Sequence, residues 1–152
     1  MSRAFVKEDD GAIEEVPDRP ISPHKNLVTP EGLAAIDAEI ARLTDAQSAA
    51  RDKEDREALA HIGRDLRYWH ARRGSAHLVE DHADDGAVRF GSRVTIERAG
   101  KREIFRIVGE DEADPERGTL SYISPLAQAL MGKEEGDETR VAGADVEILK
   151  IA

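Results

Sequence analysis

Residues 29–43 read TPEGLAAIDAEIARL, and this stretch decides the fold of the N-terminal half. Thr29 is a good N-cap, and Pro30 suits the first helical position, where its missing N–H costs nothing. Apolar residues then recur at spacings of 3, 4 and 3. This spacing predicts a helix with a narrow apolar stripe, like that of a coiled coil. The stripe consists of Leu33, Ile36, Ile40 and Leu43.

A second stripe of the same width follows a polar stretch over residues 45–57. Neither stripe can bury itself alone, so the two predict an antiparallel helical hairpin within residues 29–80, with its turn near residues 48–57. The outer faces are charged, which indicates that the hairpin projects into solvent or into a partner. Gly74 is expected to end the second helix. The second stripe consists of Leu59, Ile62, Leu66 and Trp69.

The C-terminal part, residues 81–152, changes to a period of two, with a turn at Ala99-Gly100. Ser124-Pro125 is an N-cap followed by a first-turn proline, and it predicts a short helix over residues 126–131. We therefore expect a small antiparallel sheet with one short helix on a face, and an α+β fold overall. The polar residues 1–28, with three prolines near their end, predict a flexible or loosely docked tail.

The charge balance points to a protein partner. Lys plus Arg number 22 against 32 Asp plus Glu, a formal net charge of −10. Because phosphate backbones repel such a chain, we expect no independent sequence-specific binding of nucleic acid and favour a basic protein surface. The N-terminus lacks the apolar run of a signal peptide and no stretch approaches a membrane span, so we expect a cytoplasmic protein without membrane contact.

No pattern of a self-contained active site is present in the sequence. The absence of Cys excludes thiolate nucleophiles and Cys-bearing zinc sites, and no GxSxG elbow or phosphate-binding glycine loop occurs. The histidines never fall at i, i+4, so we expect no metal site, no cofactor of the chain's own and no enzyme. The five histidines are His24, His61, His70, His77 and His82.

An acidic cluster lies at the predicted hairpin turn and includes Asp52 and Asp55. One interpretation is a solvated, charged turn. The other is that these carboxylates help to hold Mg²⁺ inside a partner's active site, because Mg²⁺ is commonly bound by one or two protein carboxylates plus waters and substrate phosphates. The residues alone leave both interpretations open.

Three segments of the C-terminal part form a recognisable set: 88–96 (VRFGSRVTI), 105–114 (FRIVGEDEAD) and 123–137 (ISPLAQALMGKEEGD). They resemble the C-terminal domain of the bacterial Gre transcription elongation factors, GreA and GreB. The similarity runs from about residue 88 to 151 and continues more weakly into the hairpin, at residues 27–32 (LVTPEG) and 64–68 (RDLRY).

The resemblance implies an FKBP-like domain fused to an antiparallel coiled coil, with bacterial RNA polymerase as partner. In Gre factors the globular domain docks at the rim of the secondary channel, and in cleavage-active members the acidic tip supports Mg²⁺ at the polymerase active site. Contact with the polymerase at the Ser-Pro loop carries over to Ser124, Pro125 and Leu126. The catalytic centre remains the polymerase's own.

The hairpin departs from the Gre pattern. A typical tip carries Asp-x-x-Glu-Asn before an aromatic residue, whereas residues 52–56 read DKEDR and no aromatic residue follows directly. The hairpin is also expected to be shorter by about ten residues per arm, a loss of roughly 15 Å of reach. A carboxylate that must touch a metal cannot tolerate that loss. A short coiled coil is also typical of the regulator of nucleoside diphosphate kinase, Rnk, a similar polymerase-binding protein.

We therefore predict a Gre-like regulator in the secondary channel without strong cleavage stimulation. The first alternative is a cleavage-stimulating factor whose Asp52 and Asp55 support a Mg²⁺ shared with the polymerase. The second is a peptidyl-prolyl isomerase-like binding domain, which rests on fold analogy alone. We expect a monomer, because the hairpin itself uses up the narrow apolar stripes.

Overall fold

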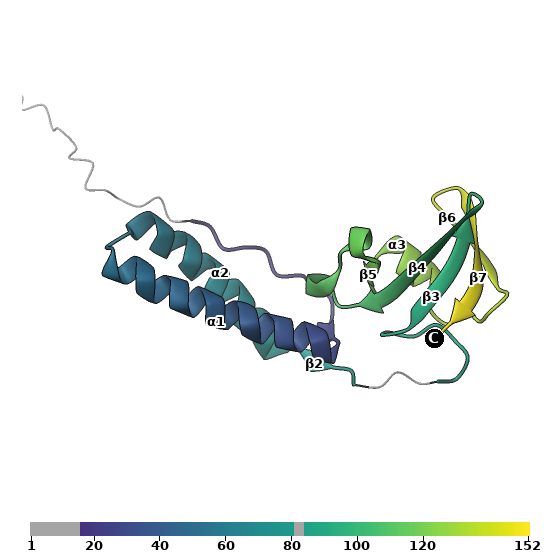
Figure 1. Cartoon of the computed structure of the whole chain (residues 1–152), viewed down its shortest axis with the longest axis horizontal. Helices are drawn as coiled ribbons and strands as arrows, with labels where there is room; N and C mark the ends of the chain where they lie inside the picture. Colours follow the sequence, from purple (N-terminus) through teal and green to yellow (C-terminus); the bar gives the residue numbers. More distant parts are fainter. Residues whose placement is uncertain (1–15, 81–83) are drawn as a thin grey trace, which may run out of the picture.

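The computed structural model describes residues 16–80 and 84–152. A long helical hairpin forms one end of the molecule and a curled sheet the other (Figure 1). This arrangement confirms the α+β class with an N-terminal helical hairpin. Of the predicted tail over residues 1–28, residues 1–15 lie outside the described part of the chain. No helix in the described part is both long and apolar enough to cross a bilayer.

Two helices, α1 (Pro30–Asp52) and α2 (Arg56–Ser75), make the hairpin. The side chain of Thr29 accepts a hydrogen bond from the amide of Gly32, as expected of the N-cap. Turn residue Glu54 has a φ of 53°, which closes the connection without glycine. Gly74 lies inside the last turn of α2, so the expected stop at that residue was wrong: the helix ends after Ser75. The buried seam consists of Ile36, Leu43, Ala50 and Leu66.

A small parallel sheet closes the base of the hairpin. Strand β1 (Leu27–Val28), directly before the N-cap, pairs with β2 (His77–Leu78), directly after α2. Val28 is only 1% exposed. The sequence predicts these two residues of β1 to belong to a flexible or loosely docked tail, whereas they are part of the hairpin base.

The globular part is a five-stranded sheet of order β5-β4-β3-β7-β6 that curls around α3 (Figure 1). The pairing of β4 with β5 is parallel, while the other three pairings are antiparallel, as predicted for the sheet. The parallel pair arises because two short 3-10 turns, η1 (Glu110–Glu112) and η2 (Pro115–Arg117), carry the chain back before β5 begins. The remaining elements are β3 (Arg93–Arg98), β4 (Lys101–Val108), β5 (Thr119–Ser121), α3 (Pro125–Leu130), β6 (Glu138–Val141) and β7 (Ala144–Ile151).

The core of the globular part lies between the concave face of the sheet and α3. Alternate residues of β3, β4 and β7 point into it, which explains the period of two in the sequence. The helix α3 contributes Leu126, Ala127 and Leu130. The strand residues of this core include Val94, Ile96, Phe105, Ile107, Val146 and Ile148.

Candidate functional site

The hairpin tip carries the two carboxylates singled out in the sequence, and the structure gives them different roles. Asp52 is the last residue of α1, and its side chain is exposed. Asp55 is the N-cap of α2: its Oδ1 accepts a hydrogen bond from the amide of Ala58 at 3.1 Å. One oxygen of Asp55 is therefore already used to satisfy an unpaired amide at the helix start.

The tip offers a metal ion few ligands. Within residues 16–80 and 84–152, no group of three or more His, Asp or Glu side chains is arranged to hold a metal ion. Asp52 and the second oxygen of Asp55 could supply at most part of a Mg²⁺ coordination sphere, with the remaining ligands from elsewhere.

The second predicted region, the start of α3, lies at the other end of the molecule from the tip (Figure 1). The Oγ of Ser124 accepts a hydrogen bond from the amide of Ala127 at 3.3 Å and caps the helix. Pro125 is exposed, whereas Leu126 is 8% exposed and belongs to the core of the globular part. A partner that meets this loop would therefore touch Ser124 and Pro125, while Leu126 positions the helix from beneath.

The junction between hairpin and sheet contains a buried ion pair that sequence reasoning missed. The side chain of Arg72, on α2, is 1% exposed, and its Nε lies 2.6 Å from Oδ2 of Asp111 in η1. The guanidinium also donates to Oδ1 of Asn26 at 2.8 Å and lies 3.6 Å from Glu110. Burial opposes the charged form of Arg72, but the hydrogen bond and charge of Asp111 outweigh it and raise the pKa of the guanidinium.

The neighbouring acid of η1, Glu112, binds the first turn of α1. Its carboxylate accepts hydrogen bonds from the amide and the hydroxyl of Thr29 and from the amide of Gly109 at 3.0 Å. Gly32 lies against the same carboxyl group, so closely that a Cβ there would overlap it. The 3-10 turn η1 therefore holds both helices of the hairpin, α1 through Glu112 and α2 through Asp111.

Tyr68 adds a third contact to this junction. Its hydroxyl donates a hydrogen bond to Oδ1 of Asp111. Burial, together with this hydrogen bond to a carboxylate, raises the pKa of Tyr68 to about 12. The run of three acids at residues 110–112 is the signal in the sequence that could have pointed to this junction.

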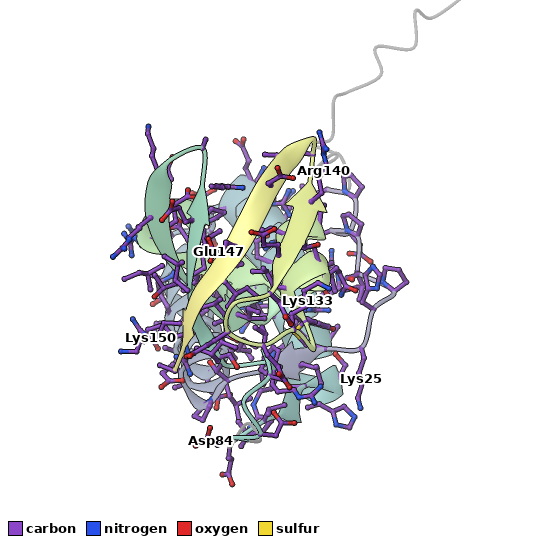
Figure 2. The ribbon with its side chains drawn as sticks, turned by 90° about the vertical axis from the view of Figure 1, so that its right-hand side faces the viewer. Lys25, Asp84, Lys133, Arg140, Glu147 and Lys150 are labelled. Atoms are coloured by element: carbon purple, nitrogen blue, oxygen red, sulfur yellow. The ribbon has the colours of Figure 1, made fainter. Side chains whose placement is uncertain are left out.

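The outer face of the sheet carries charges of both signs, among them Arg140 on β6 and Glu147 and Lys150 on β7 (Figure 2). An open groove of about 470 Å³ lies between residues 84–87, the turn 134–135 and the C-terminal residues 151–152. Four carboxylates line it, those of Asp84, Asp85, Glu134 and Glu135. Part of this charge is already compensated, because Asp85 pairs with Arg89 at 2.7 Å.

Residues 83–152 match the family model described as "Transcription elongation factor, GreA/GreB, C-term". The chain is 34% identical over 134 residues to GreA of Ruegeria pomeroyi, covering 75% of this chain and 86% of that protein. It is 35% identical over 149 residues to GreA of Jannaschia sp., covering 82% and 96%.

A GreB is among the relatives as well: that of Xanthomonas axonopodis pv. citri is 36% identical over 133 residues, covering 74% of this chain and 79% of the relative. Among solved structures, GreA factor homolog 1 (Gfh1) of Thermus thermophilus aligns with 85% of this chain and 99% of its own. That alignment has a TM-score of 0.41 and 17% sequence identity.

Proposed function

The chain belongs to the GreA/GreB family of transcription elongation factors, and on that premise we propose that it binds bacterial RNA polymerase at the secondary channel without strongly stimulating transcript cleavage. The hairpin enters the channel and the globular part stays at its rim. The chain acts in the cytoplasm as a monomer, by protein contact. It holds no cofactor of its own, and any hydrolysis remains the polymerase's reaction.

The length of the hairpin carries the proposal of weak cleavage stimulation. Helix α1 has 23 residues and α2 has 20. At 1.5 Å per residue, the longer helix extends about 35 Å. The alignment with the Ruegeria GreA spans 134 positions but uses only 75% of the 152 residues here, so that relative carries residues with no counterpart in this chain. We infer that part of this difference is a shorter hairpin in this chain.

The chemistry of the tip supports the same proposal. Metal support requires a carboxylate oxygen within about 2 Å of the ion. One oxygen of Asp55 is committed to the N-cap of α2, which leaves Asp52 as the more available group. The alternative of a cleavage-stimulating factor depends on this exposed Asp52, which would have to meet a Mg²⁺ held by the polymerase.

The test uses backtracked RNA polymerase complexes with a limiting amount of an active Gre factor. The protein is titrated in while RNA cleavage is followed. We expect a dose-dependent fall, because the chain occupies the channel without supporting hydrolysis. A rise that Asp52→Asn abolishes would establish the cleavage-stimulating alternative, and no change at saturation would refute channel binding.

A matched pair of variants tests the docking region in the same assay. Pro125→Glu adds charge to the exposed start of α3 and keeps the helix, because acidic residues are favoured in a first turn. We expect it to compete at least tenfold more weakly than the wild type. Glu147→Gln, an exposed change on β7, should compete as the wild type does.

A further inference from the structure

An extended segment, residues 16–26, lies along α2 and is referred to below as the strap (Figure 1). Its C-terminal end is firmly anchored. Asn26 is 4% exposed, and its Nδ2 donates to the carbonyl of Arg72 at 2.8 Å and to the Oγ of Ser75 at 3.2 Å. Strand β1 follows directly, so this end of the strap is part of the buried base of the hairpin.

The other end of the strap rests on the middle of α2. Asp18 pairs with Arg67 at 2.7 Å, and Arg19 lies 3.6 Å from Asp65. The guanidinium of Arg19 also stacks over the ring of Tyr68, 3.8 Å from its centroid. These contacts place ion pairs and a cation–π interaction next to one another at the middle of α2.

The two ends differ in how strongly they are held. The side chains of Asp18 and Arg67 are 70% and 58% exposed, and those of Arg19 and Asp65 are 37% and 28% exposed. Exposed ion pairs contribute little to stability and are screened by salt. Buried hydrogen bonds such as those of Asn26 are costly to break. The strap therefore has a permanent root at Asn26 and an end at residues 18–19 that can be released at low cost.

The releasable end covers the aromatic part of the hairpin surface. Tyr68 and Trp69 form an edge-to-face pair with centroids 5.0 Å apart, and the guanidinium of Arg19 lies 5.6 Å from the Trp69 ring centre. Tyrosine, tryptophan and arginine are the residues most enriched at protein contact sites. The strap contacts α2 as far towards the tip as Asp65, which is about 14 Å from Arg56, the first residue of the helix. It therefore increases the cross-section of the half of the hairpin that lies nearer the base.

We propose that the strap is an autoinhibitory contact: its end at Asp18 and Arg19 packs on α2 at Asp65, Arg67, Tyr68 and Trp69, and leaves this surface when the hairpin enters the polymerase. This inference rests on the proposed function. Molecules with a closed strap cannot bind the polymerase. The apparent dissociation constant is therefore the intrinsic one divided by the fraction of molecules whose strap is open.

The test compares locked and released forms of one protein. The chain has no Cys, so Asp18→Cys with Arg67→Cys introduces the only two thiols. Bridging them with a short bis-maleimide locks the strap, and capping each thiol with N-ethylmaleimide provides a chemically matched released form. We expect the released form to bind polymerase about threefold to tenfold more tightly than the locked form, as measured by competition with an active Gre factor.

A second variant removes the contact without labels. Arg19→Ala should tighten binding in the same direction, while Arg73→Ala, which breaks only the exposed pair with Asp37, should leave binding unchanged. Equal affinities of the locked, released and Arg19→Ala forms, or tighter binding of the locked form, would refute the strap as an inhibitor while channel binding stands. If none of the forms competes, channel binding fails and the strap proposal fails with it.

Discussion

Arg72 and Asp111 form an ion pair of 2.6 Å in which the side chains are 1% and 10% exposed, and this pair joins α2 to the turn after β4. Two charges removed from water are tolerable only when paired and hydrogen-bonded. The pair is completed by Asn26 and Tyr68, which bind its free donors and acceptors. The orientation of the hairpin on the sheet thus depends on a polar network as well as on apolar packing.

The first prediction concerns this pair. Asp111→Ala leaves the guanidinium of Arg72 buried with only Glu110 as a nearby counter-charge. We expect the free energy of unfolding to fall by about 3 kcal/mol, the lower end of the cost of breaking a buried pair. Chemical denaturation followed by circular dichroism measures the change.

A neighbouring arginine provides the control. Arg73 pairs with Asp37 at 2.7 Å, nearly the distance of the buried pair, but these two side chains are 46% and 53% exposed. Asp37→Ala should therefore change the unfolding free energy by less than about 1 kcal/mol. Equal losses for Asp37→Ala and Asp111→Ala would mean that burial does not set the strength of the junction.

The second prediction concerns pH. The hydroxyl of Tyr68 has a pKa raised to about 12, whereas an unfolded tyrosine ionises near 10. Between these values the unfolded chain has lost the proton and the folded chain still holds it, so the stability contributed by Tyr68 is complete below about pH 10 and is lost as the pH rises towards 12. Titration of tyrosinate absorbance should show that Tyr68 ionises at a clearly higher pH in the folded protein than in the urea-unfolded chain.

Tyr68→Phe separates the effect of Tyr68 from that of Tyr122. Burial raises the pKa of Tyr122 as well. The variant should be about 1 kcal/mol less stable at neutral pH, because Asp111 loses a hydrogen bond. Between about pH 10 and 12 its stability should also decline much less than that of the wild type. A decline as steep as that of the wild type would assign the effect to other groups.

The elements of this fold could be predicted from sequence because each depends on local periodicity. The spacing of Ile36, Leu43 and Leu66 predicted the seam of the hairpin, and the alternation through Val94 and Ile96 predicted a strand that faces a core. These residues are buried for the reason that the pattern indicates. The N-caps were also predictable, since Thr29 and Ser124 act within three residues of themselves.

The junction could not be predicted in this way. Arg72 and Asp111 are 39 positions apart, and Thr29 and Glu112 are 83 apart. Nothing in a period of 3.6 or 2 assigns a charged side chain to the interior, so such residues are interpreted as exposed by default. The parallel pairing of β5 depends likewise on η1 and η2, two short turns without a periodic signature.

The third prediction uses two helical glycines. Gly32→Ala places a Cβ where the Glu112 carboxyl group lies, so that group must leave the amides of Thr29 and Gly109. We expect the free energy of unfolding to fall by about 2 kcal/mol, because overpacking and broken hydrogen bonds both contribute. Thermal and urea denaturation measure this loss.

Gly63→Ala is the matched change on the other helix. A Cβ there meets only the far end of the Arg67 side chain, at 3.5 Å. Alanine in a helix interior is favoured over glycine by about 0.5–1 kcal/mol, so this variant should be more stable than the wild type. Stabilisation by both substitutions would show that Glu112 is not needed to hold α1.

The last prediction separates the two roles of the hairpin tip. Asp55→Ala removes the N-cap of α2 and should cost about 1 kcal/mol of stability, whereas Asp55→Asn keeps an accepting side-chain oxygen and should cost little. Because the proposed function assigns the tip no contact with the catalytic Mg²⁺, both variants should compete in the backtracked-complex assay as the wild type does, once corrected for the folded fraction. If Asp55→Asn preserves stability yet alters RNA cleavage, then the carboxylate charge itself reaches the polymerase active site, and the hairpin is long enough to act there.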